Sequence, residues 1–182
     1  MGKRVLITGA AGNLGGLLAR RLLKDEVLLH LLVHRQDVSP ELKAKDNVNV
    51  FWADLAVRES LGSALDGVDT IVHFAGVLFK HNPEKFLKTT NTLYFKNLLD
   101  VAVQKGVKRV ILISFPHVEG ETTPDHPARG RLDGNPVSMH ARTRLEEERL
   151  LFEYGERRGF EPVALRVGMV YGKGILMIDA AR

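Results

Sequence analysis

A glycine-spaced turn near the amino terminus has the residues that a phosphate-binding turn requires. The apolar run 4–8 leads into Gly9, Gly12 and Gly15, and a helical pattern covers residues 14–24. In such a turn the first glycine permits a tight bend, the second lets the backbone approach a pyrophosphate, and the third allows close packing of helix on strand. Amide groups at the start of the helix attract the anion. A strand before the glycines and a helix after them favour a dinucleotide site over an ordinary turn.

The residues after the predicted second strand bear on the choice of cofactor. An acidic residue at this place accepts hydrogen bonds from the adenosine ribose of NAD, whereas a cation accommodates the 2′-phosphate of NADP. The chain has His34 and Arg35 here, and Asp37 follows a little later. These residues favour NADP over NAD. The alternative is a surface arginine, because a register error of one residue turns the side chain to the other face.

Short apolar runs alternate with helical patterns along the chain, as is typical of a parallel sheet that helices cover on both faces. The predicted strands are residues 4–8, 28–33, 48–52, 70–74, 109–114 and 162–167. The predicted helices are residues 14–24, 58–65, 84–105 and 137–158. The sequence therefore predicts a doubly wound α/β fold with three layers, α/β/α, in which residues 1–182 form one domain.

The composition excludes several other classes of site. The chain has no cysteine, which excludes disulfides, thiolate metal sites and thiol nucleophiles. Its seven histidines form no close pair of the HExxH kind, so no metal site is expected. No apolar run approaches the ~20 residues that span a bilayer, and the amino terminus leads into a strand rather than a signal peptide, so we expect a cytoplasmic protein with no membrane partner. The net charge of +4 is scattered, without a basic stripe or interleaved aromatic residues, and no nucleic-acid partner is expected.

Several further motifs follow in a characteristic order. They are residues 8–15, Asp54-Leu55, residues 73–76, Asn91 and residues 165–172. In order and spacing they resemble the extended short-chain dehydrogenases/reductases, most closely the NAD-dependent epimerase/dehydratase branch, over essentially the whole chain. The resemblance implies a Rossmann-type fold, a bound NAD or NADP, and hydride transfer to or from a sugar nucleotide or a small carbonyl substrate.

The resemblance, together with the two patterns above, gives a set of expected cofactor contacts. Asp54 and Leu55 would meet the adenine, residues 74–76 would line the dinucleotide, and Val167 and Gly168 would approach the nicotinamide. The expected cofactor-binding residues are Gly9, Gly12, Asn13, Leu14, Gly15, His34, Arg35, Asp54, Leu55, Phe74, Ala75, Gly76, Asn91, Arg144, Val167 and Gly168. Other interpretations stay open: Asp54 can cap a turn, Ala75-Gly76 can be a packing bend, and Asn91 can be a solvated helix residue.

The catalytic centre of the family is substituted in this chain. Family members have a tyrosine, a lysine four residues later on the same helix face, and an upstream serine or threonine that orients the substrate. Here His140 occupies the tyrosine place and Arg144 the lysine place, while Phe115 stands where the hydroxyl residue is expected and Ser114 lies one position early. The candidate catalytic residues are therefore His140, Arg144 and Ser114.

The chemistry of these substitutions leaves two functions open. A guanidinium beside His140 pushes the imidazole toward its neutral form, which still shuttles a proton, and Ser114 or His117 would assist it. Histidine is shorter than tyrosine, however, and a small misplacement costs ~100-fold in rate. Arg144 donates to ribose hydroxyls or phosphate but is no proton shuttle. The chain is thus either an oxidoreductase or epimerase that uses His140, or a noncatalytic NAD(P)-binding redox sensor or accessory subunit.

Three further segments bear on substrate and partner. Residues 121–135 contain prolines and glycines without any period, and we expect an exposed loop where an active-site lid would lie. Extended family members continue past Tyr171-Gly172 into a substrate domain, which we expect to be absent or truncated in this chain, and residues 175–181 look like the start of a helix. Helices 84–105 and 137–158 are the candidates for pairing in a homodimer.

Overall fold

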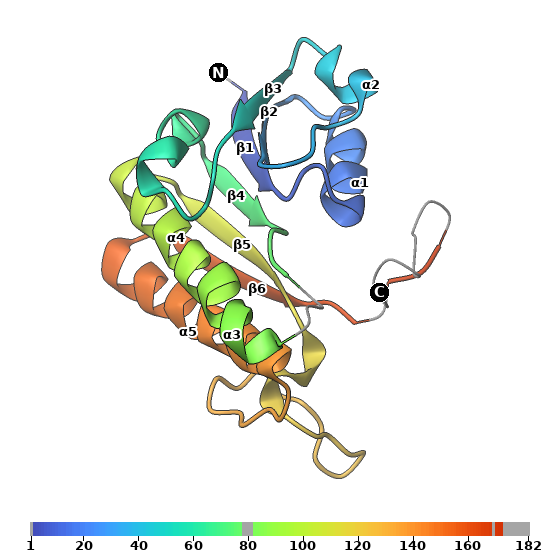
Figure 1. The fold of residues 1–182 in the computed structure, drawn as a ribbon, viewed down its shortest axis with the longest axis vertical. Coiled ribbons are helices and arrows are strands. Elements are labelled where there is room, and N and C mark those ends of the chain that lie inside the picture. The colour runs from blue at the N-terminus through green and yellow to red at the C-terminus, as the bar shows by residue number, and fades with distance from the viewer. Residues whose placement is uncertain (1, 78–81, 169, 173–182) are drawn as a thin grey trace.

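Six parallel strands form one sheet in the computed structural model of this protein, which describes residues 2–77, 82–168 and 170–172. The strands are β1 (Lys3–Thr8), β2 (Val27–Val33), β3 (Val48–Trp52), β4 (Thr70–His73), β5 (Arg109–Ser114) and β6 (Glu161–Arg166). Their order across the sheet is β3-β2-β1-β4-β5-β6, as Figure 1 shows. The strand order reverses beside β1, and doubly wound sheets bind ligands beyond the carboxyl ends of the strands at such a point.

Helices cover both faces of this sheet. On one side, α1 (Asn13–Leu22) and α2 (Pro40–Lys43) lie beside β1, β2 and β3 (Figure 1). On the other side, α3 (Pro83–Leu87), α4 (Tyr94–Gln104) and α5 (Met139–Arg158) stand together (Figure 1). Short turns of helix complete the connections: η1 (Arg58–Leu61), η2 (Ser63–Leu65), η3 (Lys88–Leu93) and η4 (Pro116–Glu119). The predicted doubly wound α/β fold with three layers is confirmed.

Burial on both faces explains why the central strands are almost continuously apolar. Leu6 and Ile7 are neighbours in β1 and are both fully buried, but Leu6 packs in the cluster around Phe95 of α4 whereas Ile7 packs in the cluster under α1. Successive residues of a strand point to opposite faces, so a strand with helices on both sides needs an apolar residue at every position.

The helices differ from the prediction in three places. The single helix expected over residues 84–105 begins as α3, widens into the π-helix η3 and continues as α4. The helix expected over residues 58–65 is two separate 3₁₀ turns, η1 and η2. The structure adds α2, which begins at Pro40 and is too short to give a periodic sequence pattern. Strand ends agree with the prediction to within one residue, and the helix expected over residues 175–181 lies outside the described residues.

The helix α5 has clear end signals. Ser138 precedes it, and its Oγ accepts a hydrogen bond from the amide of Ala141 at 3.2 Å, which caps the first turn. The helix ends at Arg158, and Gly159, with a φ of +80°, caps its carboxyl end. No helix within the described residues is long and apolar enough to cross a membrane.

Candidate functional site

A cleft with a volume of about 470 Å³ opens at the carboxyl ends of β1, β2, β3 and β4. Its walls are Gly9, Ala11, Leu32, Val33, His34, Arg35, Gln36, Ala53, Asp54, Leu55, Ala75, Gly76, Val77, Thr90 and Tyr94. Seven of the predicted cofactor residues lie in this list: Gly9, His34, Arg35, Asp54, Leu55, Ala75 and Gly76. The ends of four strands meet at one edge of the sheet, and the cleft there brings together residues from five separate parts of the sequence.

Two glycines of the first turn, Gly9 and Gly15, have the tight bend and the close helix packing that their spacing predicts. Gly9 has a φ of +68°, and a Cβ there would lie 2.9 Å from the amide nitrogen of Ala75. A Cβ on Gly15 would collide with the carbonyl oxygen of Gly9, so the close approach of α1 to the turn requires a glycine. The amide of Gly12 donates to the carbonyl of Gly9 at 2.9 Å and closes the turn. Because no side chain caps α1 at Gly12, the start of this helix is suited to an anion.

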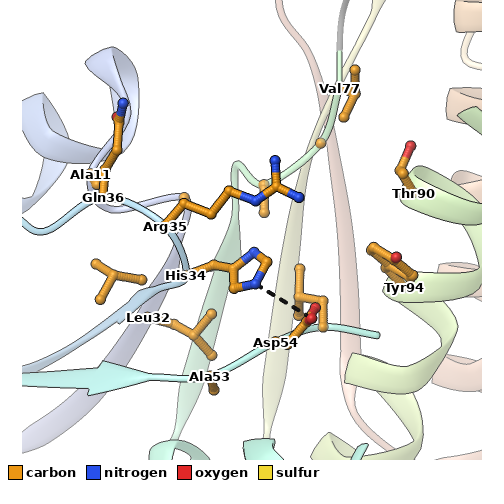
Figure 2. A pocket seen from close by; sticks show the side chains of 15 residues that line it. Ala11, Leu32, His34, Arg35, Gln36, Ala53, Asp54, Val77, Thr90 and Tyr94 are labelled. Atoms are coloured by element: carbon orange, nitrogen blue, oxygen red, sulfur yellow. Dashed lines mark ion pairs between the residues drawn. The ribbon is translucent and has the colours of Figure 1, made fainter. Parts of the chain in front are cut away.

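His34 and Arg35 extend from β2 into the cleft, as Figure 2 shows. Nε2 of His34 lies 3.4 Å from Oδ2 of Asp54, which comes from the end of β3. Oδ1 of Asp54 also accepts the amide of Ala56 at 2.9 Å, so this residue both caps a turn and faces the cleft. The nearby acid Asp37 is bound to Lys43 and to the amide of Val38, and it does not line the cleft.

The segment after β4 is fixed to β1 by Thr8. Oγ1 of Thr8 accepts the amide of Ala75 at 3.2 Å and lies 2.8 Å from Nδ1 of His73. His73 is 2% exposed, and burial, with a smaller effect of Arg144, lowers its pKa to about 3, so the ring is neutral. Phe74, which the resemblance placed on the dinucleotide, packs instead with the cluster under α1 and does not line the cleft.

Asn91 supports the cleft from behind. Its Oδ1 accepts the amide of Val77 at 2.9 Å, and its Nδ2 donates to the carbonyl of Val77 and to Oγ1 of Thr143, each at 3.3 Å. The residue is 1% exposed, so the alternative of a solvated helix residue is wrong. Asn91 does not itself line the cleft. Its hydrogen bonds connect the wall of the cleft to η3 and α5, which makes it a positioning residue.

The imidazole of His140 is held in an apolar contact. Its ring meets Phe115 edge-on, with 5.0 Å between ring centroids and 62° between the planes. Nδ1 is buried and has no hydrogen-bond partner within the described part of the chain. Burial first, and then the charge of Arg144, lower the pKa of His140 to about 4, so the imidazole is neutral at pH 7. The side chain is therefore a weak base with one nitrogen held away from solvent.

Arg144 lies inside the protein and is bound by an acid. It is 4% exposed, and its Nη1 donates to Oε2 of Glu147 at 2.7 Å. Its guanidinium packs against Gly76, where a Cβ would lie 3.1 Å from Cζ. Burial raises the pKa of Glu147 to about 7 although Arg144 opposes this change, and Oε1 of Glu147 is buried without a partner in the described residues. Arg144 therefore touches the wall of the cleft from its buried side.

Ser114 also has an acidic partner that sequence reasoning missed. Its Oγ donates to Oε1 of Glu148 at 2.5 Å, and Glu148 in turn accepts from Arg166 at 2.7 Å. Ser114 is thus part of a contact between the sheet and α5, and its proton is not directed to His140. Val167 donates its amide to the carbonyl of Ser114 at 3.2 Å, and neither Val167 nor the exposed Gly168 lines the cleft.

The predicted lid, residues 121–135, is mostly exposed, as expected, but it is fastened to the fold by Glu119. This buried carboxylate accepts the amides of Arg129, Gly130 and Arg131 at 2.7–3.1 Å, and it also binds the side chains of Arg131 and Arg166. The hydrogen bonds outweigh the effect of burial and lower the pKa of Glu119 to about 2. No group of three or more His, Cys, Asp or Glu residues that suits a metal ion occurs among the described residues.

Known proteins are similar to this chain in sequence and in fold. Residues 5–180 match the model of the NAD dependent epimerase/dehydratase family. A uronate dehydrogenase from Pseudomonas putida is 32% identical over 166 residues, which cover 91% of this chain and 60% of that protein. The structure of a mutant uronate dehydrogenase from Agrobacterium tumefaciens in complex with NAD is 28% identical, with a TM-score of 0.69 over 87% of this chain and 58% of that one.

A UDP-glucose 4-epimerase from Thermus thermophilus, solved with NAD, has a TM-score of 0.77 at 24% identity over 94% of this chain, and this likeness concerns the fold alone. The chain spans 60% of the length of the Pseudomonas putida uronate dehydrogenase and 58% of the length of a second one, from Pseudomonas syringae. The family match covers almost every residue, and the six-stranded sheet and glycine turn agree with it. This chain therefore belongs to the NAD-dependent epimerase/dehydratase family.

Proposed function

We propose that this protein binds a nicotinamide dinucleotide in the cleft at the carboxyl ends of β1, β2, β3 and β4. The observation that supports this proposal is that the glycine turn and the ends of three further strands form one cleft. The backbone at Gly12 and the amides at the start of α1 would lie against the pyrophosphate, because helix amino termini attract anions. His34 would bind the adenosine ribose, and Asp54 and Leu55 would contact the adenine.

A preference for NADP over NAD follows from the charges at the end of β2. Arg35 lines the cleft, whereas Asp37, the acid next in sequence, is bound to Lys43. A cation at this place accommodates the 2′-phosphate of NADP, and an acid would repel it. Arg35 and the pairing of Asp37 thus both support NADP.

The dinucleotide site is tested by calorimetric titration with NADPH and NADH. Gly12→Asp is expected to weaken binding of both by about 100-fold or more, because its carboxylate opposes the pyrophosphate and its Cβ would lie 3.1 Å from the carbonyl oxygen of Gly9. Gly62→Asp is the matched control, since a Cβ there meets no atom closer than 4.0 Å and the residue lies outside the cleft. Undiminished binding by Gly12→Asp, or no binding by the unaltered protein, would overturn the proposal.

For the reaction we propose an oxidoreductase or epimerase that acts on a sugar nucleotide or another sugar-derived carbonyl compound. The relatives support this class, because they are named as uronate dehydrogenases and sugar-nucleotide epimerases. The dinucleotide would supply or accept the hydride. His140, at the tyrosine place of the family, would exchange the proton in its neutral form.

A noncatalytic dinucleotide-binding subunit or redox sensor is the second candidate, and specific contacts favour it. Arg144 and Ser114, which would assist His140, are bound to Glu147 and Glu148 inside the protein. A base with a pKa of about 4 is also poorly matched to proton transfer near pH 7.

Turnover separates the two candidates. With NAD⁺ or NADP⁺ and a panel of uronates and UDP-sugars, we expect turnover that falls about 100-fold in His140→Ala while dinucleotide affinity stays within twofold. The rate should be flat above pH 5, because the pKa of His140 is about 4. His126→Ala, at an exposed loop position, is the control. Tight dinucleotide binding without turnover on the panel would reject the enzyme in favour of the second candidate.

A further inference from the structure

Glu147 of α5 is a buried acid that depends on one partner. Its side chain is completely buried, and Oε2 accepts a hydrogen bond from Nη1 of Arg144 at 2.7 Å. Oε1 is also buried and has no hydrogen-bond partner in the part of the chain that the structure describes. Burial opposes the charged form of a carboxyl, whereas a nearby cation favours it. The charge of Glu147 is therefore maintained by Arg144.

The other charged groups around α5 do not take over this role. Glu146 and Glu148, its neighbours on the helix, oppose the charge of Glu147. His73 of β4 and His140 of α5, which both feel the charge of Arg144, are neutral at pH 7 because burial lowers the pKa of each. The titratable groups on the other elements that pack against α5 are Glu84 and Lys85 of α3, Lys88 of η3, Tyr94, Lys96 and Asp100 of α4, Arg109 of β5, His117 and Glu119 of η4, and Glu161 and Arg166 of β6. Within the described residues none of them forms a hydrogen bond or an ion pair with Glu147, so its protonation depends chiefly on Arg144.

Arg144 also touches the segment that forms one wall of the cleft. A Cβ on Gly76, which lines the cleft, would lie 3.1 Å from Cζ of Arg144. The preceding residue, Ala75, contacts the glycine turn, because a Cβ on Gly9 would lie 2.9 Å from its amide nitrogen. The guanidinium and a ligand at the glycine turn thus lie on opposite sides of one backbone segment. Charges separated by so little protein interact more strongly than in water, because the effective dielectric constant is lower.

We propose that dinucleotide binding in the cleft is coupled to the uptake of a proton by Glu147, with Arg144 as the link between the two sites. This inference rests on the proposed dinucleotide site and deepens it, because it names a regulation of that site by pH. The pyrophosphate brings negative charge to the side of the wall opposite Arg144. This charge attracts the guanidinium away from Glu147 and opposes a second negative charge behind the wall, so both effects favour the neutral carboxyl. By linkage, protonation of Glu147 raises the affinity for the dinucleotide by the same factor.

The pH range of this coupling follows from the titration of Glu147. Burial raises the pKa of this carboxyl to about 7 in the free protein. For a further rise of about one unit in the complex, the affinity is highest below pH 7 and falls by about fivefold as pH rises from 7 to 9. Proton uptake is then greatest between the two pKa values, at about 0.5 proton per ligand near pH 7.5.

Calorimetric titration with NADH tests the proposal. NADH is the probe because it has no phosphate monoester, whose second ionisation near about pH 6 would itself change the affinity with pH. Titrations at about pH 7.5 in buffers with different enthalpies of ionisation give the number of protons taken up, and titrations at a series of higher pH values give the change in affinity. We expect the uptake of about 0.5 proton and the fivefold fall in affinity that the linkage requires.

Two variants separate Glu147 from other groups. In Glu147→Gln, proton uptake should vanish, and the affinity for NADH should stay within twofold over the same pH range. Glu153→Gln is the matched control and should keep the uptake of the unaltered protein, since Glu153 lies on the same helix but is 47% exposed and pairs with Arg157. If the unfolding temperature shows that Glu147→Gln does not fold, Arg144→Met with Glu147→Leu replaces the pair by apolar side chains and should bind NADH without proton uptake.

The outcomes distinguish this inference from the dinucleotide site itself. Binding of NADH by the unaltered protein without proton uptake would overturn the coupling while the site stands. Uptake that persists in Glu147→Gln or in the double variant would also overturn it and assign the proton to another group, such as His34 in the cleft. Loss of uptake in Glu153→Gln as well would contradict the specific role of Glu147. Absence of NADH binding would overturn the proposed function, and this inference with it.

Discussion

Replacement of Arg144 by methionine is expected to lower the free energy of unfolding progressively as pH rises above 7, by up to about 3–5 kcal/mol at high pH, because it leaves the carboxylate of Glu147 buried and unpaired. Glu147 is completely buried, and Arg144 is its hydrogen-bond partner at 2.7 Å. Its second oxygen, Oε1, already has no partner among the described residues. Nothing else in the described contacts of Glu147 would compensate its charge. Urea unfolding followed by circular dichroism measures this loss.

The loss of stability in Arg144→Met should depend on pH, in the direction that the pKa of Glu147 determines. The pKa of this carboxyl is raised from 4.5 to about 7 in the folded protein. As pH rises from 4.5 to 7, the unfolded chain releases this proton before the folded chain does, so stability falls across this window. Without Arg144 the pKa rises further and the window extends upward. The difference in the free energy of unfolding between Arg144→Met and the unaltered protein should therefore be small at pH 5 and grow as pH rises above 7.

A double variant keeps this prediction testable if the single variant fails to fold. Arg144→Met with Glu147→Leu replaces the buried pair by apolar side chains and should recover most of the lost stability. Arg157→Met is the matched control, since Arg157 pairs with Glu153 on the same helix at 2.7 Å but is 73% exposed, and it should cost less than about 1 kcal/mol. Equal stability of Arg144→Met and the unaltered protein at pH 8 would show that the pair does not support the fold.

Most residues of the cleft could be predicted because they lie at or just after the end of a strand, whereas Thr90 of η3 and Tyr94 of α4 could not. Gly9, His34, Asp54 and Ala75 lie far apart in the sequence, yet the carboxyl ends of parallel strands bring them to one edge. The hydrophobic runs indicate where the strands lie, and parallel strands place their carboxyl ends at the same edge of the sheet. Phe74 lies in the same segment as Ala75 but packs toward α1, because neighbouring residues of an extended chain point to opposite sides.

Contacts that depend on tertiary packing were not visible in the sequence. Asn91 lies in the π-helix η3 and bonds to Val77 and Thr143, and no periodic pattern in the sequence reveals this wider turn. The pairing of Arg144 with Glu147 did have a signal, since opposite charges three residues apart are neighbours on a helix. The resemblance to the family, in which a lysine occupies this place, predicted a contact of Arg144 with the cofactor and not with this nearby acid.

The role of Glu119 was likewise missed, because its partners lie ten to twelve residues away in a loop without any pattern and in β6. The sequence shows only an acid between Val118 and Gly120. The structure shows a carboxylate that collects three backbone amides and two arginine side chains. Such an arrangement is stable only while the carboxylate is ionised, since a protonated acid loses acceptor strength toward all of these donors.

Glu119→Gln is therefore expected to lower the free energy of unfolding by about 3 kcal/mol at pH 7 and to expose residues 129–131 to hydrogen exchange. The NH₂ group of glutamine is a donor and would face other donors in this site. Because the pKa of Glu119 is lowered from 4.5 to about 2, its contribution is present above pH 4.5 and is lost as pH falls through 2. The difference in the free energy of unfolding between Glu119→Gln and the unaltered protein should therefore shrink as pH falls from 4.5 to about 2.

The matched control is Glu121→Gln, an exposed acid at the start of the same loop, which should change neither stability nor exchange. Hydrogen exchange is the sharper measurement, because it reports the three loop amides themselves rather than the whole fold. If these amides exchange in Glu119→Gln as slowly as in the unaltered protein, the loop is held by its other contacts, such as the bond from Arg149 to the carbonyl of Leu132 at 2.8 Å. If they exchange faster while α5 stays protected, the loop opens as a unit about Glu119, and a lid over the cleft would have to break this anchor before it moves.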